Sequence, residues 1–241
     1  MSGSPRPRTV ARRMVGGSSL RALSTALIVA GVLMLTDAGL TVTWQEPVSA
    51  VYAWIVQDRL GDDLRTLELR RPSDLDRQAL SALPGERLRM AFLGRSLRHD
   101  AAPGAAVGRI AIPKIEADIV VVNGTRTGAL RKGPGIYEDT PFPGTPGTTA
   151  IAGHRTTYLA PFRHIDRLRR GDGIVVRMPY GRFTYEVEKT RIVEPTRVSV
   201  INRVAYDRLV LSACHPLYSA AQRIVVFAKL VGSQARGAAR L

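Results

Sequence analysis

Residues 107–231 consist of short β-prone runs broken by glycine and proline, and this pattern constrains the fold more than any other feature of the chain. Period-two alternation and β-branched residues are typical of strands. Two segments, 129–133 and 161–168, are expected to form short helices. Many short strands separated by turns predict an all-β sandwich or barrel, and a closed barrel leaves no unpaired edge. The runs expected to supply seven or eight strands are 108–113, 119–122, 148–152, 173–178, 182–193, 209–214 and 223–231.

Residues 22–44 form an apolar run that is long enough to cross a bilayer as a helix. Residues 1–21 precede it as a basic tail, while Asp37 lies near the far end and Trp44 suits an interface. The positive-inside rule then places the amino terminus in the cytoplasm and the following domain outside the cell. A cleaved signal peptide, ending near Ala50, and a buried core helix are alternatives. An uncleaved single-pass anchor is expected, because the apolar run exceeds the usual signal-peptide core.

Residues 45–106 are expected to form a helical juxtamembrane spacer and linker. Val51, Ile55, Val56, Leu60 and Leu64 have helical spacing. Ser73 is a candidate N-cap for a second helix that ends before Pro84. A solvated spacer is the default interpretation, with a docking or lid segment as the alternative. Residues 99–106 are expected to be a flexible linker, and 233–241 a basic tail.

The formal net charge is +15 and the pI is near 11.0, mostly because of arginine. Such a charge suits a membrane surface or anionic wall polymers as well as nucleic acid. Nucleic acid is not an expected partner, because the sequence has no zinc-finger spacing, no basic zipper and few aromatic residues. The single cysteine excludes an internal disulfide and a cysteine-based zinc site, and no metal or cofactor is expected.

That cysteine, Cys214, lies at the end of an expected strand, and Arg223 begins the next one nine residues later. If the two strands pair in opposite directions, the guanidinium comes close to the thiol. A neighbouring cation favours a thiolate and supplies donors for an oxyanion. The alternative is an inert, buried small residue, the usual state of a lone cysteine. His154 also follows a strand, after Gly153, which favours a cysteine–histidine enzyme over a simple surface histidine.

The segments 153–158 (Gly-His-Arg-Thr-Thr-Tyr) and 211–216 (Leu-Ser-Ala-Cys-His-Pro), together with Arg223, resemble sortases, most closely the class E sortases of high-GC Gram-positive bacteria. The resemblance covers residues 107–231 and the N-terminal anchor. It implies an eight-stranded sortase-type β-barrel in residues 107–232. Cys214 would end the seventh strand and Arg223 would lie on the eighth.

The same resemblance implies a two-step transpeptidation. Cys214 would attack the Thr–Gly carbonyl of a sorting signal of the Leu-Ala-x-Thr-Gly type, Arg223 would hold the oxyanion, and His154 would protonate the leaving amine. An amine of a peptidoglycan precursor or a pilin would then resolve the thioester acyl-enzyme. The expected partners are therefore sorting-signal proteins, that amine acceptor and the cell membrane.

Tyr158, Ala213 and His215 are the candidate substrate-binding residues, with Tyr158 placed at the alanine region of the signal. The sequence departs from the family pattern Thr-Leu-x-Thr-Cys, because Val210 and Ala213 replace its two threonines. One histidine suffices for this chemistry, so neither His215 nor His164 is expected to act as the acid.

Three alternatives to a protein-anchoring sortase remain. A pilin-polymerising sortase is less favoured, because no lid motif precedes the barrel and residues 233–241 are short and polar. An L,D-transpeptidase would need a Ser-x-Gly-Cys context, which is absent here. A membrane-anchored basic domain that binds anionic cell-wall polymer without catalysis is the third.

Overall fold

The computed structural model describes residues 17–43 and 47–240, which fall into two units. The first unit holds one helix, α1 (Gly17–Thr43). Its segment Leu20–Gly39 is long and apolar enough to cross a membrane, and it is not buried against other parts of the protein. The expected basic tail before Gly17 and the interfacial position of Trp44 lie outside the described residues. The role of α1 as a membrane anchor stays a prediction.

The second unit, of which residues 47–240 are described, is built on a closed eight-stranded barrel with the order β1-β2-β3-β4-β7-β8-β6-β5. The predicted all-β barrel is confirmed. Parallel pairing joins β2 to β3 and β4 to β7, and the other neighbours run antiparallel. The strands are β1 (Ala106–Ile112), β2 (Ala117–Asn123), β3 (Gly135–Ile136), β4 (Thr148–Ala152), β5 (Gly173–Met178), β6 (Gly181–Val193), β7 (Arg208–His215) and β8 (Gln222–Ala235).

Two details of the barrel differ from expectation. The two-residue strand β3 was not predicted, because so short a run shows no periodicity. β8 continues to Ala235 and is followed by the short helix η4 (Gly237–Arg240), whose Ala239 is buried. Residues 233–240 are thus packed structure rather than a solvated tail. The other short helices are α5 (Thr127–Leu130), η1 (Pro113–Ile115), η2 (Ile165–Arg167) and η3 (Val198–Ile201).

The barrel interior is the main hydrophobic core. Its lining alternates along each strand, so that Leu209, Leu211 and Ala213 of β7 point inward. Val210 of β7 points outward, where it packs with Ala150, Val225 and Phe227. The outer face of β4, β7 and β8 therefore carries a second apolar cluster, which is covered by Tyr137, Val193, Val200 and Ile201.

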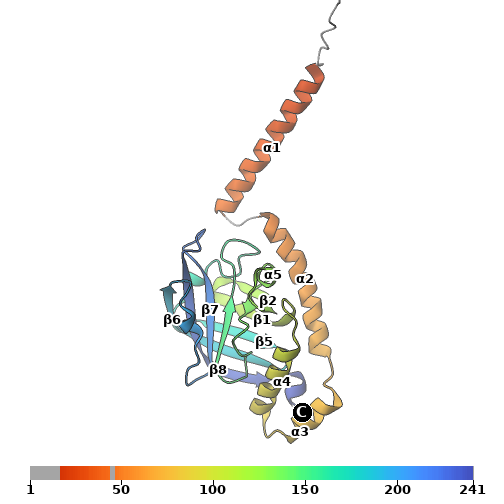
Figure 1. Ribbon diagram of the computed structural model, residues 1–241, viewed down its shortest axis with the longest axis vertical. Coiled ribbons are helices and arrows are strands. Elements are labelled where there is room, and N and C mark those ends of the chain that lie inside the picture. Colours follow the sequence, from red (N-terminus) through yellow and green to blue (C-terminus); the bar gives the residue numbers. More distant parts are fainter. Residues whose placement is uncertain (1–16, 44–46, 241) are drawn as a thin grey trace, which may run out of the picture. The chain divides into compact units, whose positions relative to one another are not determined.

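The helices α2 (Pro47–Leu69), α3 (Asp74–Ala82) and α4 (Glu86–Asp100) belong to the same compact unit as the barrel (Figure 1). Leu60 and Leu64 of α2 are buried against Val120 and Val122 of β2. Gln57 donates to the carbonyls of Val120 and Lys132 and accepts from the amide of Val120. This differs from the expected solvated spacer, since an apolar helix face of this kind is more stable against the barrel than in water.

The predicted N-cap of the second helix is present. Ser73 accepts from the amide of Asp76, and the Asp76 carboxylate accepts from the amide of Ser73. The expected flexible linker is instead held in place. Gly104 donates to the carbonyl of Asn123, whose amide donates to the carbonyl of Ala105. Strand β1 therefore begins directly from an ordered turn.

Candidate active site

The hairpin formed by β7 and β8 brings the candidate nucleophile and the candidate oxyanion donor together. Cys214 pairs directly with Arg223, and His215 pairs with Gln222. Opposed residues of an antiparallel pair project to the same face, with Cβ atoms about 4.5–5.5 Å apart. The predicted antiparallel pairing of Cys214 with Arg223 is therefore present, and Cys214 is only half-buried.

Parallel pairing places His154 beside this hairpin. Ala152 of β4 pairs with Ser212 of β7, and the amide of Gly153 donates to the carbonyl of Ser212 at 3.0 Å. His154 follows Ala152 by two residues, and Cys214 follows Ser212 by two residues, so both lie just beyond this pair. Gly153 is needed for close packing, because an added Cβ would lie 2.5 Å from Cδ2 of the buried Phe162.

The site opens on the outer face of the barrel. Cys214 shares its face of β7 with Val210, in the outer cluster, whereas Ala213 lies in the interior core and is 3% exposed. The side chain of Ala213 therefore faces the barrel interior, and its expected contact with substrate stays a prediction that this orientation does not favour. The residues in place of the family's threonines, Val210 and Ala213, both pack in apolar clusters.

His215 likewise lies on the opposite face from Cys214, because consecutive strand residues alternate. Its Nδ1 lies 3.3 Å from Nη1 of Arg155, which can only donate, so Nδ1 accepts. His215 thus supports the site from behind and is not brought to the face where Cys214 is exposed. His164 directly precedes η2, whose Asp166 pairs with Arg155.

Arg155 was not singled out from the sequence, yet it joins three segments of the site. It is 3% exposed and pairs with Asp166 at 2.9 Å. It also donates to the carbonyl of Arg163 and, at 3.4 Å, to that of Cys214. Its position directly after His154 was the only sequence signal for this role.

The imidazole of His154 is half-buried. Its Nε2 is buried and has no hydrogen-bond partner among the described residues. Burial lowers the pKa of His154 below the ordinary imidazole value, because the charged form loses solvation. The ring of Tyr158, with its centroid 5.2 Å from that of His154, contributes to the cover.

The first turns of α2 reach the same loop. The amide of Tyr158 donates to Oγ of Ser49 at 3.1 Å, and the ring of Tyr52 meets that of Tyr158 edge-on at 6.2 Å. Tyr158, Leu159 and Ala160 all have left-handed backbone, with φ of 50°, 65° and 42°. Such a run is unfavourable for non-glycine residues, so external contacts of this kind are needed to hold it.

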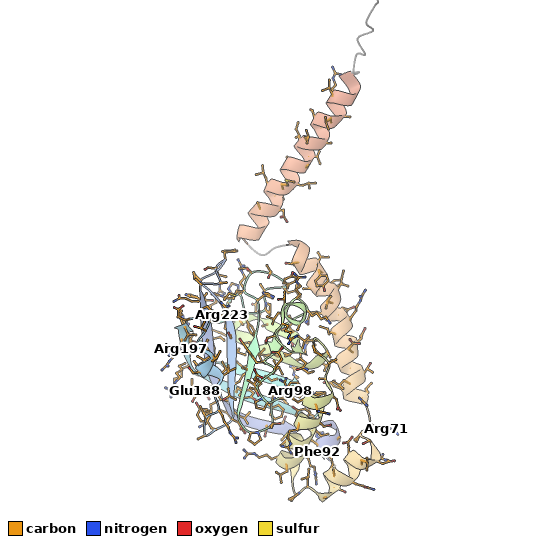
Figure 2. All side chains as sticks on the ribbon, viewed as in Figure 1. Arg71, Phe92, Arg98, Glu188, Arg197 and Arg223 are labelled. Carbon is orange, nitrogen blue, oxygen red and sulfur yellow. The ribbon has the colours of Figure 1, made fainter. Side chains whose placement is uncertain are left out.

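Arg223 is held by its own loop. Nη1 donates to the carbonyls of Ala220 and Gln222, each at 2.9 Å. These bonds fix the guanidinium at the strand end, and they leave Nε and Nη2 without a hydrogen bond to any residue that the structure describes. Figure 2 shows Arg223 toward the end of the barrel that the first turn of α2 reaches, whereas Arg71 lies toward α3. Within the described ranges, no group of three or more His, Cys, Asp or Glu side chains could hold a metal.

A closed barrel with a cysteine, a histidine and an arginine gathered at the ends of β4, β7 and β8 defines the sortase type of fold and site. Residues 110–231 match the family model of the sortase domain. The chain belongs to the sortase family.

Relatives come from more than one sortase class. Sortase D of Bacillus subtilis is 36% identical over 132 residues, 53% of this chain and 65% of that protein. Sortase SrtE1 of Streptomyces coelicolor is 28% identical over 150 residues, 56% of this chain and 43% of that protein. The chain therefore spans less than two thirds of the length of each of these relatives.

Solved structures agree with the fold. The structure of sortase E from Streptomyces avermitilis superposes with a TM-score of 0.51 at 33% identity, covering 56% of this chain and 93% of that one. A Clostridium perfringens sortase D5 transpeptidase superposes with a TM-score of 0.52 at 25% identity, covering 61% and 99%.

Proposed function

We propose that this protein is a membrane-anchored cysteine transpeptidase that joins sorting-signal proteins to a cell-wall amine. One observation supports the proposal: the barrel register pairs Cys214 with Arg223 and sets the end of β4, two residues before His154, beside Ser212 of β7. The three residues come from strands far apart in sequence, and they have the chemistry of an acid, a nucleophile and an oxyanion donor.

The proposed reaction begins with the Cys214 thiolate attacking the carbonyl carbon of the scissile amide between Thr and Gly. A C–S bond forms, and the carbonyl oxygen takes the negative charge, which the free donors of Arg223 stabilise. The His154 imidazolium gives its proton to the leaving amide nitrogen, the C–N bond breaks, and a thioester remains. The acceptor amine then attacks the thioester, neutral His154 takes the proton from this nitrogen, and the thiolate leaves. Water as acceptor would give hydrolysis.

The proposed signal is of the Leu-Ala-x-Thr-Gly type, with Tyr158 as the contact for its alanine region. Support comes from the position of Tyr158, which lies beside His154 and is half-buried. Sortases D and E both match the chain, so the class E type of signal rests on the resemblance of segments 153–158 and 211–216. The accepting amine would belong to a peptidoglycan precursor.

The proposed location is the cell membrane, with α1 as a single span, the amino terminus in the cytoplasm and the barrel outside. The candidate span Leu20–Gly39 supports it by length and composition. Arginines precede the span, and the only acidic residue within it is Asp37, near the far end.

The test is turnover of a Leu-Ala-x-Thr-Gly peptide, with and without an amine, by the full chain in detergent. Cys214→Ala should abolish cleavage and transfer, and mass spectrometry should find the acyl adduct on Cys214 of the unsubstituted chain.

Arg223→Ala should lower the rate by about 10²–10³, as removal of one oxyanion donor does elsewhere. Arg223→Lys should recover little, because a point charge replaces a fixed fork. His154→Ala should lose most activity, because the leaving amine loses its proton donor, whereas His164→Ala, the matched control, should stay within a few fold of the unsubstituted chain. Full activity of Cys214→Ala would refute the proposal.

A further inference from the structure

The outward face of α2 carries an apolar patch that is confined to its first turns. Val51, Trp54 and Ile55 share this face and are 61%, 66% and 41% exposed. The same face continues with Asp58 and Asp62, which are both exposed. A contiguous exposed apolar patch that ends in charged residues marks an interaction surface.

The orientation of this patch is fixed by the opposite face of the helix. Ala53, Leu60 and Leu64 are buried on that face. Gln57 lies beside them and bonds to the backbone of Val120 and Lys132. The helix cannot rotate to hide Trp54 without breaking these contacts. The patch therefore points away from the barrel.

The short connection between α1 and α2 indicates that the partner of this patch is the membrane. α1 ends at Thr43 and α2 begins at Pro47, so four Cα steps, at most about 15 Å, separate their ends. With 27 residues, α1 is about 40 Å long, which matches a bilayer including its headgroups. The first turn of α2 is thus tethered within reach of the interface, where tryptophan is enriched.

We infer that Val51, Trp54 and Ile55 insert into the interfacial region of the membrane that α1 spans, an inference that rests on the proposed anchoring. Asp58 and Asp62 limit how far α2 inserts, because burying a charged carboxylate in a bilayer is energetically unfavourable. Only the outward side chains of the first turns of α2 enter the lipid.

This docking holds the candidate active site at the membrane surface. Ser49, in the first turn of α2, bonds to the amide of Tyr158, whose ring covers His154. The membrane-facing end of α2 and the catalytic end of the barrel are therefore the same end. A substrate that is itself held in the bilayer would meet Cys214 without leaving the surface.

The experiment uses the two tryptophans of the chain, Trp44 and Trp54. The full chain with Trp44→Phe, which keeps Trp54 as its single tryptophan, is reconstituted into phosphatidylcholine–phosphatidylglycerol vesicles. Emission is then quenched either by lipids brominated near the headgroup or by aqueous iodide. The matched control carries Trp44→Phe, Trp54→Phe and Leu69→Trp, because Leu69 ends the same helix and is 82% exposed.

The expected result is lipid quenching of Trp54 with little effect of iodide, and the reverse for the control. Equal iodide quenching at both positions, or lipid quenching at both, would overturn the docking. Release of the protein by alkaline carbonate would refute the anchor itself, and with it the docking. Retention of the protein with a water-exposed Trp54 would refute the docking alone.

A second measurement tests the consequence for catalysis. Trp54→Ser with Ile55→Ser should leave turnover of a soluble peptide unchanged, but lower transfer from a vesicle-embedded substrate by about tenfold as effective concentration is lost. Leu69→Ser with Leu75→Ser, at 82% and 78% exposed positions, is the control and should change neither rate. If the Trp54→Ser, Ile55→Ser variant transferred the vesicle-embedded substrate as fast as the unsubstituted chain does, the proposed orientation would be contradicted.

Discussion

Arg155 connects the loop after β4 to strand β7 through a set of contacts that its residue type does not reveal. Its guanidinium is buried between the loop that carries His154 and the strand that carries Cys214, and it bonds to backbone or side chains of both neighbourhoods. It lies behind the face of β7 that carries Cys214, so we propose that it positions His154 relative to the thiol.

We expect Arg155→Ala to lower kcat about 10–100-fold with little change in KM, because a small misplacement of the acid is costly. Arg155→Lys should recover only part, since the fork that reaches Asp166 and Cys214 is lost. Steady-state kinetics with the signal peptide measure both constants. Arg170→Ala, at an exposed position, is the control. A folded Arg155→Ala variant with unchanged kcat would rule out positioning.

The lowered pKa of His154 predicts the pH dependence of leaving-group protonation. The imidazolium is the form that donates, so the competent fraction falls as the pH rises through this pKa, below the usual value near 6.5. Tyr158→Ala should admit water to the ring, raise its pKa and move the alkaline limb of kcat to higher pH. A pH profile of peptide cleavage checks this. An alkaline limb that does not move, or moves down, would contradict desolvation as the cause.

Helix α2 is the element whose role the structure changes most. One face packs on β2, its first turn bonds to the active-site loop, and its outward patch remains exposed. A helix with these contacts belongs to the catalytic unit, so a fragment that begins at Ala106 would lack part of the support for His154.

We expect Gln57→Ala to lower the free energy of unfolding by about 1–3 kcal/mol, because the backbone groups it satisfies lose a partner in a partly buried place. Arg59→Ala, on an exposed position of the same helix, is the control and should stay within about 0.5 kcal/mol. Guanidinium denaturation of the full chain in detergent gives both values. Equal stability of the two variants would show that α2 is only loosely held.

The charge of the whole molecule acts over a longer range than any of these contacts. A net charge of +15 favours association with any anionic surface, and we propose anionic lipid and wall polymer as that surface. This attraction is screened by salt and needs no particular geometry. It should therefore be separable from catalysis.

We expect Arg170→Ser with Arg203→Ser, both at exposed positions, to lower the salt concentration at which the protein elutes from an anionic wall-polymer column. Each arginine near an anionic surface contributes about 1 kcal/mol. Hydrolysis of the soluble peptide should be unchanged, because neither residue lies near Cys214. Parallel loss of retention and of hydrolysis would show that charge and catalysis are coupled.

The sequence by itself determined the barrel class, the apolar span and the pairing of Cys214 with Arg223, because these follow from local periodicity, length and the register of a tight hairpin. The proposed membrane role of the apolar span remains a prediction. Tertiary structure alone decided which face of β7 turns inward, and so placed Ala213 in the core and Cys214 on the outer face, since strand alternation acquires a direction only when the barrel closes. It also decided the contacts of Arg155 and of α2. These join segments 59 and 109 residues apart, which no local pattern encodes.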